Sequence, residues 1–208
     1  MNNLIDDISV FHSSIRINDG KIIYFDPFRI DSEKHDADLI FITHAHYDHY
    51  SIEDIEKIIN DNTIIVAPKS MEGEINFSNE IVFAEPQKEY NAGGIDFKTV
   101  HAYNKLKPFH PKSNKWLGYV VNLNGTSYYV AGDTDLTNEA KEIKCDVAFL
   151  PCGGMYTMNV SEASKLANEI VPKYAIPIHY GAIVGNKNDG EEFVNLLNKE
   201  IIGRILIK

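Results

Sequence analysis

The chain has 208 residues, of which 44% are hydrophobic and 24% charged, so it has the composition of a globular protein large enough to bury a sizeable core. Asp and Glu outnumber Lys and Arg by 30 to 20, and the formal charge of −10 argues against nucleic acid or anionic lipid as a partner. No apolar run approaches the roughly 20 residues that cross a bilayer, so we expect no membrane span. The acidic start of the chain does not resemble a signal peptide, and we expect a cytoplasmic protein with one domain over residues 1–208.

Short apolar or alternating runs, which are typical of strands, recur along the whole chain. They predict strands at residues 8–17, 21–25, 39–43, 63–67, 80–84, 95–101, 117–123, 127–131, 146–150, 174–178 and 204–207. The pair Asn124–Gly125 separates two of these runs and predicts a tight hairpin turn.

Three stretches have the spacing of amphipathic helices. Ser51 and Asp54 resemble a capping box at the start of the first helix. Ser161 is expected to cap the second helix, which Pro172 ends. The third helix is expected at about residues 190–198.

The strongest motif is a group of histidines directly after the apolar run at residues 39–42. Residues two apart in an extended segment point to the same side, so His44 and His46 can hold one metal ion together. Asp48 and His49 are adjacent, so their side chains diverge and can face a second ion nearby. Imidazole and carboxylate donors suit zinc, iron or manganese, and the density of the motif disfavours a solvated histidine-rich loop.

Two further candidate ligands also follow predicted strands. Asp133 comes directly after residues 127–131, and His179 comes directly after residues 174–178. Alone, Asp133 would be interpreted as a turn or cap residue and His179 as a core histidine. Their shared position favours ligands, because rigid strand ends hold side chains accurately and a carboxylate such as Asp133 can bridge two cations.

In this order, the HxHxDH motif at residues 44–49, the pair Gly132–Asp133 and the final His179 resemble the metallo-β-lactamase superfamily of dinuclear metallohydrolases. The resemblance covers about residues 10–207 and is greatest for the compact, cytoplasmic Zn-dependent hydrolase subgroup. It implies an α/β fold, a four-layer αβ/βα sandwich in which helices flank two mixed β-sheets and the metal site lies at one edge.

The resemblance also implies a ligand set and a cofactor. By position, the ligands are His44 and His46 for the first ion, Asp48, His49 and His179 for the second, and Asp133 for both. The implied cofactor is two divalent ions, zinc in the first place, with manganese or iron as alternatives.

The chain departs from the family at Asn104, where another histidine usually binds the first ion. Asparagine is a poor zinc ligand, and two histidines are able to replace it. His110 is preferred, because a similar His-Pro-Lys segment recurs in the subgroup; His101, three positions before Asn104, is the alternative. If neither binds, the site would work with one ion.

Several residues are candidates for supporting roles. Asp26 is expected either to orient a ligand histidine or to occupy a turn. Tyr103, Tyr156 and Tyr180 adjoin predicted site loops, as does Asn104, and a tyrosine there either donates a hydrogen bond to a developing oxyanion or simply packs.

The remaining polar side chains have weaker patterns. His12 lies in an alternating segment and is expected to have a structural role, whereas His35 is expected on the surface. Lys105, Lys107 and Lys112 would form a positive rim that suits a small anionic substrate, although a solvated loop explains them equally well.

The expected function is hydrolysis of a small ester, lactone, thioester or phosphodiester. Two cations sharing a ligand lower the pKa of a bridging water toward neutrality, and Asp48 would orient the resulting hydroxide as well as bind metal. The alternative is a metal-binding or sensing module of the same fold without turnover. The sequence leaves the substrate, the metal and the oligomeric state open.

Overall fold

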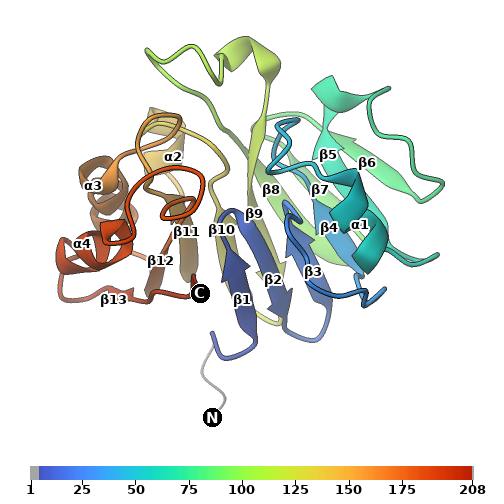
Figure 1. The fold of residues 1–208 in the computed structure, drawn as a ribbon, viewed down its shortest axis with the longest axis horizontal. Helices are drawn as coiled ribbons and strands as arrows, with labels where there is room; N and C mark the ends of the chain where they lie inside the picture. The colour runs from blue at the N-terminus through green and yellow to red at the C-terminus, as the bar shows by residue number, and fades with distance from the viewer. Residues whose placement is uncertain (1–4, 208) are drawn as a thin grey trace.

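The computed structural model describes residues 5–207, which form two mixed β-sheets packed face to face (Figure 1). The first sheet contains, in spatial order, β1 (Ile8–Phe11), β2 (Ser14–Asn18), β3 (Ile22–Phe25), β4 (Leu39–Phe41), β5 (Ile64–Pro68) and β6 (Ile81–Ala84). The second contains β13 (Ile202–Gly203), β12 (Tyr174–Ile178), β11 (Val147–Pro151), β10 (Thr126–Val130), β9 (Leu117–Leu123), β8 (Ile95–His101) and β7 (Glu89–Ala92).

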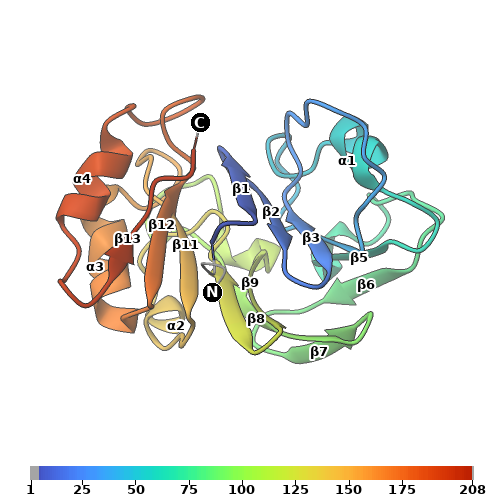
Figure 2. The same cartoon turned by 90° about the horizontal axis from the view of Figure 1, so that it is seen from below.

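Helices cover the outer faces of both sheets (Figures 1 and 2). Helix α1 (Ile52–Ile58) packs on the first sheet, while α2 (Asn138–Lys141), α3 (Val160–Ile170) and α4 (Asp189–Asn195) pack on the second. Two short 3₁₀ helices, η1 (Lys69–Met71) and η2 (Lys112–Asn114), lie in connections. The result is the four-layer α/β sandwich expected from the resemblance.

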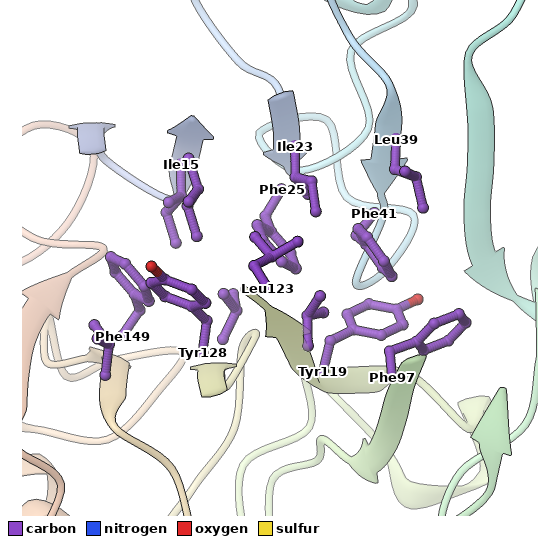
Figure 3. Packing of buried hydrophobic residues seen from close by; sticks show 14 of the residues in the cluster. Ile15, Ile23, Phe25, Leu39, Phe41, Phe97, Tyr119, Leu123, Tyr128 and Phe149 are labelled. Carbon is purple, nitrogen blue, oxygen red and sulfur yellow. The ribbon is translucent and has the colours of Figure 1, made fainter. Parts of the chain in front are cut away.

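The alternation of side chains along the strands builds the layers. In β3 and β4, Phe25 and Phe41 point between the sheets, whereas Tyr24 and Ile40 point toward α1. Across the interface the ring of Phe41 lies 5.1 Å from that of Tyr119, an edge-to-face contact in the core between the sheets (Figure 3).

The parallel strands decide where the site lies. Strands β3 to β6 run parallel, as do β10 to β13. The segments that follow β4, β10 and β12 therefore emerge at one edge of the sandwich. This is the edge at which the sequence predicted ligands.

The structure corrects the predicted strand at residues 8–17. The chain reverses at His12, whose φ of 54° lies in the left-handed region, and β1 pairs with β2 as an antiparallel hairpin. Both arms have the same apolar alternation and no Gly, Pro or Asn marks the turn, so the pattern does not show the break. The turn predicted at Asn124–Gly125 is confirmed: both residues have positive φ between the paired strands β9 and β10.

Other boundaries also differ from the predictions. The strand expected at residues 204–207 is not formed; β13 is Ile202–Gly203, and Ile207 makes only an isolated bridge to Val10. The short elements β7 and α2 were not predicted. Among residues 5–207, no helix is long and apolar enough to cross a membrane.

Candidate metal centre

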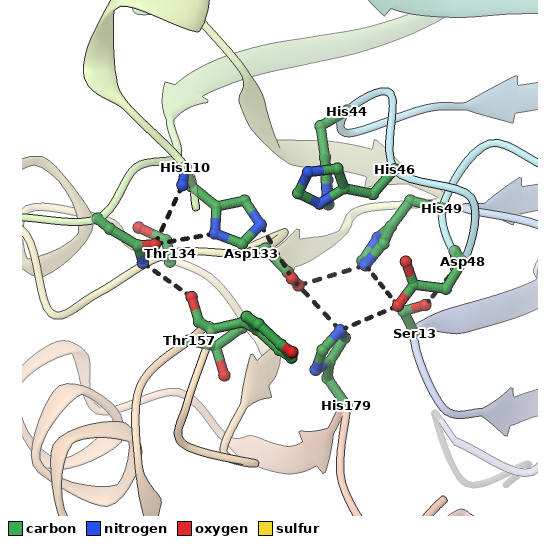
Figure 4. A network of polar contacts seen from close by, with 12 residues as sticks. Ser13, His44, His46, Asp48, His49, His110, Asp133, Thr134, Thr157 and His179 are labelled. Atoms are coloured by element: carbon green, nitrogen blue, oxygen red, sulfur yellow. Dashed lines mark hydrogen bonds and ion pairs between the residues drawn. The ribbon is translucent and has the colours of Figure 1, made fainter. Parts of the chain in front are cut away.

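Four segments that are distant in sequence bring histidines and carboxylates together at one edge of the sandwich (Figure 4). The residues are His44, His46, Asp48 and His49 after β4, His110 between β8 and β9, Asp133 after β10, and His179 after β12. All of them are buried except His46, which is half-buried. The structure thus brings together all seven residues for which the sequence predicted metal binding.

The first group consists of His44, His46 and His110, each with one ring nitrogen within 4.8 Å of the others. The Nε2 atom of His44 lies 3.1 Å from Nδ1 of His46. His101 does not join this group, because its Nε2 donates to the carbonyl oxygen of Lys112 at 2.9 Å. Of the two histidines that were open after the sequence analysis, only His110 faces this group.

Asp133 lies between the first group and the other ligand candidates. Its Oδ2 is 3.2 Å from Nε2 of His110 and 3.3 Å from Nε2 of His179, and its Oδ1 is 3.4 Å from Nε2 of His49. Asp48 completes the second side, with Oδ2 3.5 Å from Nε2 of His179. One carboxylate therefore contacts histidines of both groups, as a bridging ligand would.

Hydrogen bonds to Nδ1, the ring nitrogen that faces away from Asp133, orient two of the histidine rings. Nδ1 of His49 lies 2.7 Å from Oδ2 of Asp26, and Nδ1 of His110 lies 2.9 Å from Oδ1 of Asn104. Both oxygens only accept hydrogen bonds, so each Nδ1 carries a proton, and Nε2 is the ring nitrogen that faces Asp133 and would bind a metal ion. Asp26 thus orients a candidate ligand, one of the two roles that its sequence position allowed.

The amide of Asn104 is itself held in one orientation. Its nitrogen donates to Oδ1 of Asp135 at 3.0 Å and to the carbonyl oxygen of Tyr156 at 2.8 Å. Its oxygen is then left to accept from the ring of His110. The departure from the family pattern is a residue that positions a histidine at the centre.

The charge balance of the cluster suits a cation. Burial raises the pKa of Asp133, but the nearby His179 and His49 outweigh burial and hold this pKa well below its ordinary value. Burial lowers the pKa of His44, which is therefore neutral and able to act as a ligand. Burial also lowers the pKa of His49, but the carboxylates of Asp133 and Asp26 more than reverse this and raise it to about 9, so this side of the cluster favours positive charge.

His12 belongs to the cluster, although its alternating neighbours predicted a structural role. It is fully buried at the turn between β1 and β2, and its Nε2 lies 3.5 Å from Oδ2 of Asp48. Its ring lies 4.1 Å from that of His179, and neither of its ring nitrogens has a hydrogen-bond partner among the described residues. The sequence carried no signal for this placement, because His12 is more than 30 positions from the nearest other member.

Trp116 was also missed. Its ring lies 4.8 Å from that of His44 and 4.9 Å from that of His46, so it supports the first group from one side. His35, in contrast, is exposed as expected.

The three tyrosines have different surroundings. Tyr156 lines a cavity of about 340 Å³ beside the candidate metal centre. The hydroxyl of Tyr103 donates to Glu139, and Tyr180 is buried among the residues beneath the helices of the second sheet. Neither Tyr103 nor Tyr180 is among the described residues that line the cavity.

The donor set fits a divalent metal. Nε2 of His49, His110 and His179 and Oδ1 of Asp133 are buried and lack a hydrogen-bond partner within the described part of the chain. Buried polar atoms without partners are costly, and imidazole nitrogen with carboxylate oxygen is a donor combination that zinc, iron and manganese accept. The residues present therefore fit a metal centre with a shared carboxylate.

Comparison with known proteins also indicates a metal-dependent protein. The model of the family described as "Beta-lactamase superfamily domain" matches residues 9–179. A relative named UPF0173 metal-dependent hydrolase, from Geobacillus thermodenitrificans, is 31% identical over 212 residues, covering 89% of this chain and 90% of the relative. A protein with the same name from Sulfolobus acidocaldarius is 32% identical over 197 residues, covering 88% of this chain and 82% of that protein.

A solved structure shows the same architecture. The crystal structure of a proposed metal-dependent hydrolase from Parabacteroides distasonis superposes with a TM-score of 0.82 at 28% identity. The match covers 97% of this chain and 93% of the other.

Proposed function

The chain belongs to the β-lactamase superfamily, and we propose that it is a metal-dependent hydrolase that binds two divalent ions and cleaves a small ester, lactone, thioester or phosphodiester. The observation that carries the proposal is the convergence on Asp133 of buried Nε2 atoms that have no hydrogen-bond partner in residues 5–207. Zinc suits these donors best, and manganese and iron accept the same set.

The geometry supports one assignment of ligands. His44, His46 and His110 form one group of donors and would hold the first ion. Asp48, His49 and His179 would hold the second ion, since Nε2 of each of the two histidines lies within 3.8 Å of Oδ2 of Asp48. Asp133, which lies close to His49, His110 and His179, would bind both ions. Asp26 and Asn104 hold Nδ1 of His49 and His110, which would leave Nε2 of each ring to bind an ion.

The chemistry combines the ions with residues that line the cavity. Two bound divalent ions lower the pKa of a water and polarise the substrate's carbonyl or phosphoryl oxygen. The carboxylate of Asp48 lines the cavity, where it can accept a hydrogen bond from the attacking water and orient it. Tyr156 lines the same cavity, and its hydroxyl is a candidate donor to a developing oxyanion.

The size of the cavity favours a small molecule. Its volume of about 340 Å³ lies at the lower end of the range for small-molecule sites.

Chelation tests the proposal. We expect the purified chain to hydrolyse at least one member of a panel of carboxyl esters, lactones, thioesters and phosphodiesters. A chelator should abolish this activity and added zinc, manganese or iron should restore it, because the ligands alone provide no activated water.

Two variants make the test specific. His49→Ala removes a ligand and should lower activity at least about 100-fold, the scale at which activated-water chemistry is lost. His35→Ala replaces an exposed histidine and should leave the hydrolytic activity unchanged. Activity that survives complete chelation would contradict a metal-dependent mechanism, and binding of two ions without any hydrolysis would favour the sensing module.

A further inference from the structure

The cavity beside the candidate metal centre has two kinds of wall. His46, Asp48, His110, Asp133 and His179 bring the candidate metal ligands to it. The rest of the described lining consists of aromatic and aliphatic side chains, which are Tyr47, Phe109, Tyr156, Ile183 and Val184.

The apolar walls come from separate segments. Tyr47 lies in the histidine-rich loop, Phe109 directly precedes His110, and Tyr156 lies between β11 and α3. The rings of Phe109 and Tyr156 meet edge to face at 4.6 Å, so two of these segments form one continuous surface.

Part of this apolar surface is exposed to solvent, which is energetically unfavourable. Tyr47 is 67% exposed and Phe109 is 41% exposed, and Met155, next to Tyr156 in sequence, is 66% exposed. Large apolar side chains gathered at the mouth of a pocket mark a place where an apolar ligand is bound.

Cationic side chains, in contrast, do not reach the cavity. None of the described residues that line it is Lys or Arg. Nζ of Lys107 is 2.6 Å from Oδ1 of Asp135, and Nζ of Lys112 is 2.8 Å from Oε1 of Glu139. Two of the three lysines that indicated an anionic substrate therefore neutralise carboxylates of the chain itself.

From these observations we infer that the substrate bears an uncharged, apolar acyl or aryl group next to the bond that is cleaved. This group occupies the space between Tyr47, Phe109 and Tyr156 while the reacting oxygen faces the ions. The inference rests on the proposed function, because it assumes that ions are bound at the base of the cavity.

Aliphatic hydroxamates test the inference without knowledge of the substrate. Their two oxygens chelate a divalent ion, and their chain length can be chosen freely. Titration calorimetry on the zinc-loaded chain should show hexanohydroxamate binding at least about tenfold more tightly than acetohydroxamate, because each further methylene leaves water. Isocaproic hydroxamate should bind more tightly than succinic monohydroxamate, which has the same shape and a terminal carboxylate.

Variants of Phe109 test whether this wall of the cavity causes the preference for longer chains. Phe109→Ser should reduce the ratio of the hexanohydroxamate and acetohydroxamate affinities at least about threefold, whereas Phe109→Leu, which keeps an apolar side chain, should largely preserve it. Leu196→Ser changes an exposed apolar residue at the end of α4 and should leave the ratio unchanged.

The outcomes separate the two proposals. Tight binding of acetohydroxamate with no gain from chain length, or a preference for the succinic compound, would overturn the apolar subsite and leave the metal centre standing. Failure of every hydroxamate to bind would contradict the metal centre, and the subsite inference would fall with it.

Discussion

The histidines of the candidate metal centre differ in what holds the ring nitrogen that faces away from Asp133. His49 is held by a carboxylate and His110 by an amide oxygen, and in both rings Nδ1 is the nitrogen that donates to this partner. His12 differs, because neither of its nitrogens has a hydrogen-bond partner among the described residues and Nε2 points at Asp48. We expect the proton of His12 to lie on Nε2, from where a small shift would let it donate to Asp48 and orient this carboxylate toward the proposed second ion.

His12→Phe tests this role while it keeps a ring in the same space. We expect one ion to be held about 10–100-fold more weakly, the usual effect of losing a partner that orients a metal ligand, as measured by competition with a chromogenic zinc chelator. A second variant, His12→Asn, suits the left-handed backbone at this position and checks that weaker binding does not come from strain. Unchanged affinity for both ions in the two variants would show that His12 only fills space.

At the residue level, the sequence predicted what lies close together along the chain. The motif from His44 to His49 is visible because its candidate ligands are neighbours in one loop. His12 and Trp116 reach the same place only through the packing of the two sheets. Their surroundings could not be predicted, since no local spacing links them to the motif.

At the level of elements, apolar alternation located most strands, but the ends depended on contacts that periodicity does not encode. Helix α3 is an example: Asn159, not the expected Ser161, is its N-cap. The side chain of Asn159 accepts from the backbone N–H of Glu162 at 2.9 Å, and Glu162 accepts from the N–H of Asn159 at 3.0 Å. This reciprocal pair places the N-cap two residues before Ser161, and the helix begins at Val160.

The cap gives a stability prediction. Asn159→Ala should lower the free energy of unfolding by about 1 kcal/mol, which is roughly 2–4 °C in Tm for a chain of this size. Ser161→Ala, at an exposed position inside the first turn, should change it by less than about 0.5 kcal/mol. Thermal unfolding of both variants checks the assignment, and a larger effect at Ser161 than at Asn159 would refute it.

At the level of the whole molecule, the two sheets position the residues of the candidate metal centre. The segments after β4, β10 and β12 converge at one edge because the strands that precede them lie in parallel portions of the two sheets. The candidate ligands thus come from rigid strand ends and from one long loop, which supplies His110. The choice between His110 and His101 could not be made from spacing, since it depends on how that loop folds back over the edge.

We infer that this edge of the sandwich holds two metal ions and that His110 is a ligand of one of them. Elemental analysis of metal per chain tests it most directly, on the wild type beside His110→Ala and His101→Ala. We predict two equivalents of metal per chain in the wild type and in His101→Ala, because the ring of His101 donates to a backbone carbonyl in the wild type. We predict about one equivalent in His110→Ala. One equivalent or none in the wild type, or loss in His101→Ala alone, would contradict the account.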